Sequence, residues 1–220
     1  QDPGRFHTGR ETFMMPVRWE NGWPVILAKG EVLPWTPRAP TLPLGSKSPV
    51  PTTGNFSWRE EFDGQELPPQ WLMARTPKHE WWKTGNGALT LELRADRIGA
   101  KVQPSFVGRR VQHMTASVSS RLNFSPSAGE EAGLLAVQSD DFYYAFVLGT
   151  NAQGEAVLRV HRRQGDKEAV EGVVVAERML AAEARNGLTL KIAIDKAKVD
   201  FSYSVDGQRF TTLLGGADAG

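Results

Sequence analysis

The feature that most constrains the fold is a strict alternation of apolar and polar residues near the C-terminus. Residues 188–195 read Leu-Thr-Leu-Lys-Ile-Ala-Ile-Asp, and residues 199–205 read Val-Asp-Phe-Ser-Tyr-Ser-Val. Successive side chains of a β-strand point to opposite faces. A period of two therefore predicts antiparallel strands that cover a core with one face.

The same alternation recurs in 87–93 and 114–124. Roughly ten short strands, with turns every eight to fifteen residues, indicate an all-β fold, namely a two-sheet antiparallel β-sandwich. Only Glu177–Arg185 has the Ala, Glu and Leu content of a helical turn or two. The residue pairs suited to tight turns are Asn86-Gly87, Asn186-Gly187 and Asp206-Gly207.

Proline and tryptophan divide the chain. Nine of the 14 prolines lie within residues 1–51, and all seven tryptophans precede residue 83. Closely spaced prolines exclude a helix and favour a stiff extended connector. We therefore predict an N-terminal piece (1–33), a Pro-rich connector (34–55) and a main domain (56–220).

The N-terminal piece has the pattern of a β-hairpin. Apolar and aromatic residues fill Phe13–Trp19 and Trp23–Ala28, and Asn21-Gly22 supplies a turn that tolerates positive φ. An isolated hairpin is marginal in water, and nothing local covers these side chains. We expect this piece to require a partner surface.

Charge and composition exclude several classes of function. The 26 Lys and Arg balance 25 Asp and Glu, which gives no electrostatic reason to expect nucleic acid or an anionic membrane as partner. The absence of cysteine removes disulfides, thiol nucleophiles and thiolate metal sites. There is no apolar run of about 18 residues and no signal-like opening.

The sequence contains no recognisable set of catalytic residues. Glu130-Glu131 and Asp140-Asp141 are adjacent pairs, and strand neighbours point to opposite faces, so neither pair aims two carboxylates at one bond. Solvated loop acids are the first interpretation of these pairs. A calcium site built from carboxylates and loop carbonyls is the alternative.

Two further clusters each allow two interpretations. In an alternating strand Arg109 and His113 would share a face, which suits either a solvated or ion-paired surface or an acidic partner or substrate. The bulky side chains of a second cluster would either close one end of the sandwich core or form a sugar-stacking platform. This second cluster is Trp71, Trp81 and Trp82.

Arg10 is the candidate binding residue. It stands in a Gly-flanked turn, residues 4–13, directly ahead of an apolar strand. A guanidinium held there can make two parallel hydrogen bonds to sugar hydroxyls or to a carboxylate. The alternative is a local pair between Arg10 and Glu11 or a backbone carbonyl.

The order of several motifs resembles the C-terminal part of glycoside hydrolase family 43, in its β-xylosidase and α-L-arabinofuranosidase branch. Residues 7–17, His-Thr-Gly-Arg-Glu-Thr-Phe-Met-Met-Pro-Val, look like the final segment of that family's five-bladed β-propeller. Residues 61–71, 106–113 and 132–134 resemble the concanavalin-like jelly-roll sandwich that follows the propeller. The resemblance therefore implies a sandwich preceded by a propeller hairpin.

The resemblance implies an exo-acting, inverting hydrolase that releases xylose or arabinose from xylan-derived oligosaccharides. Its general base, general acid and third carboxylate come from blades that precede residue 7, so no catalytic residue is placed here. Arg10 matches the arginine that contacts the terminal sugar. His7 does not inherit the role of the catalytic histidine at the propeller's central metal.

The resemblance also implies what must complete the protein. Family members continue beyond residues 214–216 with a further strand and a loop that lends an aromatic side chain to the active site, so we expect 56–220 to lack its last strand. The expected partners are a pentose-containing oligosaccharide and an N-terminal propeller segment or companion chain. No cofactor or metal is expected in this chain, although the complete enzyme could hold Ca²⁺. The alternative function is a non-catalytic carbohydrate-binding or scaffolding module.

Overall fold

The computed structural model describes residues 14–38, 40–43, 45–46, 48, 50–181 and 186–219. These residues fall into two compact units, whose described parts lie within 14–60 and 61–219. None of the described residues belongs to a helix long and apolar enough to cross a membrane.

The described residues of the larger unit form β-strands and one 3-10 turn. Its elements are β3 (Leu72–Met73), β4 (Trp82–Gly85), β5 (Ala88–Leu91), η1 (Ile98–Ala100), β6 (Val107–Gly108), β7 (Thr115–Asn123), β8 (Ala132–Ser139), β9 (Phe142–Thr150), β10 (Ala156–Gln164), β11 (Val173–Met179), β12 (Asn186–Asp195), β13 (Lys198–Ser204) and β14 (Thr211–Asp218). The predicted all-β fold class is confirmed.

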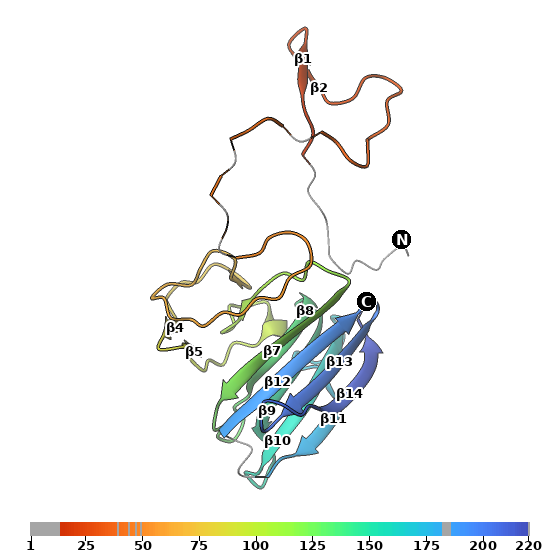
Figure 1. Cartoon of the computed structure of the whole chain (residues 1–220). Coiled ribbons are helices and arrows are strands. Elements are labelled where there is room, and N and C mark those ends of the chain that lie inside the picture. Colours follow the sequence, from red (N-terminus) through yellow and green to blue (C-terminus); the bar gives the residue numbers. More distant parts are fainter. Residues whose placement is uncertain are drawn as a thin grey trace. The chain divides into compact units, whose positions relative to one another are not determined.

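Two four-stranded antiparallel sheets form the sandwich (Figure 1). One has the order β14-β13-β12-β7, and the other is the meander β11-β10-β9-β8. The rings of Phe146 on β9 and Phe201 on β13 meet edge to face at 5.6 Å, and both side chains are fully buried. Their contact joins the two inner faces, as the alternation of apolar residues predicts.

The predicted helical turn at Glu177–Arg185 is wrong for the residues that the structure describes. Glu177–Met179 complete strand β11, where Glu177 pairs with Arg159 of β10. Residues 182–185 lie outside the described part of the chain. The composition of this segment favours a helix, but intrinsic helix propensity is weak and tertiary contacts can override it. Here the pairing of β11 with β10 and the ion pair between Glu177 and Arg159 stabilise a strand instead.

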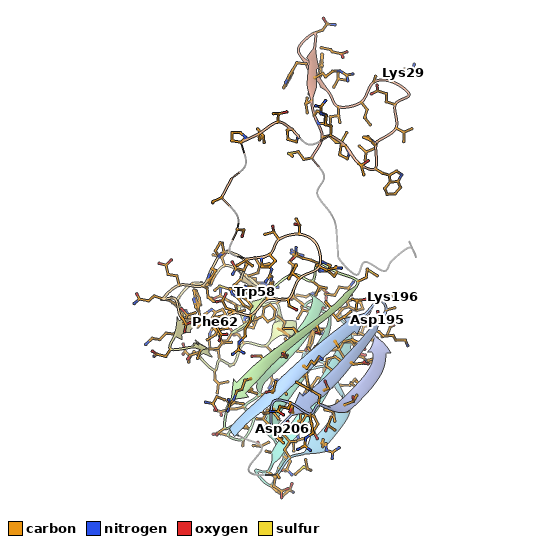
Figure 2. The ribbon with its side chains drawn as sticks, viewed as in Figure 1. Lys29, Trp58, Phe62, Asp195, Lys196 and Asp206 are labelled. Atoms are coloured by element: carbon orange, nitrogen blue, oxygen red, sulfur yellow. The ribbon has the colours of Figure 1, made fainter. Side chains whose placement is uncertain are left out.

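The three predicted turn pairs have different outcomes. Asn86-Gly87 connects β4 and β5, with φ of 54° and 74°. Asp206 lies in the connection from β13 to β14, where its carboxylate accepts hydrogen bonds from the backbone N–H groups of Gln208 and Arg209 (Figure 2). Asn186-Gly187 is instead the start of β12, where the register with β7 shifts.

The smaller unit contains the predicted hairpin in a shorter form. Strands β1 (Arg18–Glu20) and β2 (Trp23–Val25) pair around Asn21-Gly22, whose φ values are 52° and 82°. Trp19 and Trp23 are 72% and 76% exposed. The described residues of this unit therefore leave both indoles largely uncovered, and such exposed apolar side chains suit a partner surface.

A layer formed by residues 61–113 covers part of the outer face of the β8–β11 sheet. Gly99 of η1 accepts a hydrogen bond at its carbonyl from Arg163 of β10. A Cβ on Gly99 would lie 2.5 Å from the Val170 carbonyl oxygen and 2.6 Å from an Arg163 nitrogen. Only glycine lets the layer approach the sheet this closely.

Gly133 of β8 is expected to tolerate no side chain. A Cβ there would overlap the Phe146 carbonyl oxygen and lie 2.8 Å from Cα of Val147. Gly133→Ala should therefore push β8 from β9 and lower the free energy of unfolding by about 3 kcal/mol, measured by urea denaturation. Gly215→Ala in β14 is the control, because its new Cβ meets nothing closer than 3.5 Å. Equal stability of the two variants would contradict this prediction.

Candidate functional site

The sequence-predicted sugar-binding residue cannot be placed in the fold. Arg10 and the Gly-Arg-Glu-Thr segment around it lie outside the residues that the structure describes, and so does His7. The role of Arg10 stays a prediction.

The tryptophan cluster is packed rather than displayed. Trp81 is 2% exposed and meets the ring of Trp82 edge to face at 5.1 Å. Trp71 is partly buried against Phe62, with 5.4 Å between ring centroids. The packing interpretation is confirmed for Trp81, whose buried indole cannot stack on a sugar.

Arg163 organises a buried ion-paired cluster at the turn between β8 and β9. Its guanidinium is 5% exposed and donates hydrogen bonds of 2.8 Å to the carbonyls of Gly99 and Asp140. It also lies 3.3 Å from the carboxylate of Asp141, which has Lys101 at 3.3 Å on its other oxygen. The Asp140 carboxylate accepts a 2.6 Å hydrogen bond from Arg75. Asp140 and Asp141 therefore both form ion pairs with basic side chains of the protein.

Glu131 is the centre of a second cluster on the outer face of the same sheet. Its carboxylate lies 3.3 Å from Nε2 of His161, 3.6 Å from Arg97 and 3.7 Å from Arg159. Arg159 also donates a 2.7 Å hydrogen bond to Glu177. The contact with His161 is the main cause that lowers the pKa of Glu131, Arg97 and Arg159 add to it, and burial opposes it.

Glu131 and Asp206 are unsuited to general-acid catalysis. A glycosidase acid needs a raised pKa, so that it still carries a proton near neutral pH. The pKa of Glu131 is lowered. That of Asp206 is lowered strongly by hydrogen bonds from the backbone of Arg209 and Gln208. Both carboxylates therefore remain ionised near neutral pH.

Neither the predicted alternative of a metal site nor the predicted strand face shared by Arg109 and His113 is found among the described residues. Within the residues that the structure describes, no three His, Asp or Glu side chains converge in a way that could hold a metal ion. The strand expected to carry Arg109 and His113 ends at Gly108, because β6 is only two residues long. A shared strand face for Arg109 and His113 is therefore wrong.

Acid titration should show the contribution of Glu131 to stability. Its folded-state pKa lies below its ordinary value of 4.5, so its stabilising effect is complete above that value and disappears as pH falls through the folded pKa. Relative to the parent chain, Glu131→Gln should lose about 1–2 kcal/mol of unfolding free energy at pH 7. Urea denaturation from pH 7 to pH 3 should show this difference shrinking. A difference that grows toward pH 3 would contradict the sign.

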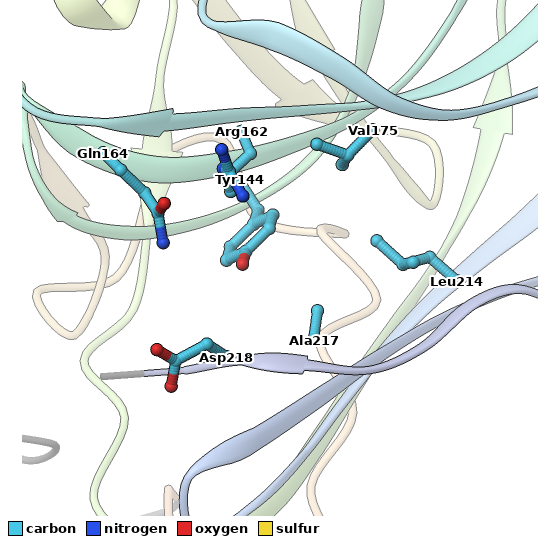
Figure 3. A pocket seen from close by; sticks show the side chains of 7 residues that line it. All are labelled: Tyr144, Arg162, Gln164, Val175, Leu214, Ala217 and Asp218. Atoms are coloured by element: carbon cyan, nitrogen blue, oxygen red, sulfur yellow. The ribbon is translucent and has the colours of Figure 1, made fainter.

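A pocket of about 170 Å³ opens between the sheets on the side where β11 and β14 lie (Figure 3). Tyr144 comes from β9, Arg162 from β10, and Leu214 and Asp218 from β14. Figure 3 shows the Tyr144 hydroxyl turned toward β14, with the Arg162 guanidinium beside the Tyr144 ring. Aromatic, cationic and anionic groups therefore meet in one small hollow.

Sequence reasoning missed both Arg163 and this pocket. The available signal was the order Leu-Arg-Val-His-Arg-Arg at 158–163, where charged residues alternate with buried apolar ones. An alternation with cationic residues on one face predicts an ion-paired outer face of the sheet. The partners of those cations lie far away in the sequence.

Comparison with known proteins agrees with a concanavalin A-like sandwich. Residues 59–220 match the family model described as "Beta xylosidase C-terminal Concanavalin A-like domain". The chain belongs to this family, which is part of the glycoside hydrolase family 43 xylosidases and arabinofuranosidases.

Two curated relatives illustrate the similarity. A non-reducing end α-L-arabinofuranosidase of Bacteroides ovatus is 34% identical over 73% of this chain and 30% of its own length. A putative β-xylosidase of Escherichia coli is 27% identical over 93% of this chain and 37% of its own length. The chain thus spans about a third of the curated relatives that it matches.

Solved structures show the same coverage. A crystal structure titled as a GH43_12 protein retrieved from a capybara gut metagenome has a TM-score of 0.80 and 26% identity, and the match covers 100% of this chain and 41% of that one. The GH43 BlXynB protein of Bacillus licheniformis has a TM-score of 0.72 and 29% identity, with 98% and 41% covered. The family and fold predicted from the sequence are confirmed.

Proposed function

We propose that the chain is the C-terminal portion of an exo-acting, inverting glycoside hydrolase that releases xylose or arabinose from xylan-derived oligosaccharides. The observation that carries this proposal is the joint presence of the family's sandwich and an uncovered apolar hairpin in one chain. The relatives named above are an arabinofuranosidase and a putative β-xylosidase.

Each part has a proposed role. Residues 1–33 are the last segment of a propeller, 34–55 connect the two domains, and 56–220 are a sandwich that takes a further strand from outside this sequence. The exposed Trp19 and Trp23 side chains suit packing against propeller blades. Arg10 binds the terminal pentose, and the sandwich buttresses the propeller and walls the pocket.

The proposal places the general acid and general base outside this chain. It is supported by the ion-paired state of Glu131, Asp140 and Asp141. The test compares this chain alone with the chain assembled with N-terminal propeller blades, on nitrophenyl β-xyloside and α-L-arabinofuranoside. We expect hydrolysis only after assembly. Hydrolysis by the isolated chain, or an inactive assembly that is correctly folded, would refute the proposal.

A further inference from the structure

The pocket between the sheets interrupts an otherwise apolar interior. Tyr144 and Arg162 are cross-strand partners on β9 and β10. They continue the inward-facing positions of Phe146 and Val160, which are fully buried. Both side chains are partly buried at the end of the apolar core face. Their buried polar atoms should have hydrogen-bond partners, because buried polar groups are normally hydrogen-bonded.

The Arg162 side chain is 33% exposed, but one of its donors is buried and retains hydrogen-bonding capacity. Its Nε atom is buried and makes no hydrogen bond to the residues that the structure describes. The nearest carboxylate oxygen recorded for its guanidinium, on Glu168, is 4.0 Å away. A bound oxygen atom would satisfy the Nε–H donor, which otherwise carries the full cost of its desolvation.

Tyr144 supplies both a donor and an acceptor. Burial raises the pKa of its phenol above the ordinary value of 10.0, and the Asp218 carboxylate acts in the same direction against the opposing effect of Arg162. The hydroxyl therefore stays protonated at neutral pH and can donate and accept. Its ring packs on Phe201 at 5.3 Å, which fixes the position of the hydroxyl.

The other residues that line the pocket provide both apolar surface and polar groups. Val175 and Leu214 provide apolar surface, while the Gln164 amide and the Asp218 carboxylate add polar groups at the same hollow. Ligand pockets combine mostly apolar walls with a few placed polar groups. A monosaccharide presents apolar C–H faces and a rim of hydroxyls, so it complements this mixture.

Size and charge restrict the ligand further. An enclosed cavity of about 150 Å³ holds one benzene ring. The 170 Å³ pocket is open on one side, so it can take part of one sugar ring while the remaining hydroxyls stay in solvent. The Arg162 guanidinium lies 4.0 Å from the Glu168 carboxylate, and Asp218 also lines the pocket, so the positive charge of Arg162 is balanced by carboxylates. This balance favours a neutral sugar over a uronic acid.

We propose that the pocket formed by Tyr144, Arg162 and Asp218 is a non-catalytic binding site for one neutral sugar residue. The proposal that a sugar binds here rests on the pocket that these described residues line. The choice of xylose or arabinose as the sugar rests on the proposed function. Such a site would hold the hydrolase on its polymer while the propeller acts elsewhere.

The test is calorimetric titration of the full chain with xylotriose, L-arabinose and glucuronic acid. Arg162→Met should weaken xylotriose binding about tenfold or more, because it removes charge-assisted hydrogen bonds. Tyr144→Phe keeps the ring and should weaken binding less. Arg178→Met is the matched control, since Arg178 is exposed on β11 outside the pocket and should leave binding unchanged. Circular dichroism melting verifies folding, and Gln164→Ala replaces any variant that fails to fold.

Each outcome decides the proposal. Saturable binding of a neutral sugar that the pocket variants weaken and Arg178→Met does not would support it. Absence of binding, equal loss in the control, or tighter binding of glucuronic acid than of xylotriose would overturn it. Hydrolysis by the assembled enzyme tests the proposed function separately, because sugar binding by this chain needs no catalytic carboxylate.

Discussion

In the assembled hydrolase, Arg10→Ala is expected to lower kcat/KM on nitrophenyl β-xyloside about 10- to 100-fold, with little change in melting temperature. Charge-assisted hydrogen bonds to sugar hydroxyls would be lost, and the chemistry needs the terminal sugar held in position. Steady-state kinetics and thermal denaturation of the same preparation measure the two quantities.

Arg18→Ala is the matched control for Arg10. Arg18 lies on β1, eight positions after Arg10 in the sequence, and its exposed side chain pairs with the exposed Glu20 at 3.4 Å. Loss of such a pair has little effect on stability, and we expect unchanged kinetics. A large drop in melting temperature for Arg10→Ala without a kinetic defect would show that Arg10 is structural.

Arg163→Met is expected to lower the free energy of unfolding by about 3 kcal/mol. The substitution keeps an unbranched apolar stem but leaves three backbone carbonyls and the Asp141 carboxylate without their buried partner. Lys101 still faces Asp141, which limits the loss. Urea denaturation followed by tryptophan fluorescence measures the change.

The control for Arg163 is again Arg178→Met, which removes an exposed arginine from the same sheet. Its free energy of unfolding should differ from that of the parent chain by less than about 0.5 kcal/mol. If both variants lose the same amount, then the effect comes from net charge and the buried cluster contributes nothing specific.

The sequence predicted the sandwich because its evidence is local. Alternation in 188–195 and 199–205 specifies which face of each strand meets the core, and β12 and β13 follow it. The predictions of local structure were wrong where residues distant in the sequence determine the conformation. Glu177 joins a strand because β10 offers it Arg159, and Asn186-Gly187 starts β12 because β7 offers a pairing edge.

The binding groups could be predicted only in part. Trp81 was predicted to be either a core or a platform residue, and burial selects the core. Arg163 donates hydrogen bonds to the carbonyls of Gly99 and Asp140, which lie 64 and 23 positions away in the sequence. The residue pattern of β10 alone does not predict these partners. The pocket is similar, since Arg162 of β10 and Asp218 of β14 meet only once both sheets have formed.

The strand order of the sandwich has a consequence for its folding on the ribosome. The meander β8–β11 needs only neighbours in sequence, whereas β7 must wait for β12, as shown by the hydrogen bond between Thr115 and Asp195 over 80 positions. At about 5–20 residues per second, synthesis leaves β7 without its partner for about 4 to 16 s. Formation of the β7–β12 pair, which closes this long loop, is therefore expected to be the slow step of folding.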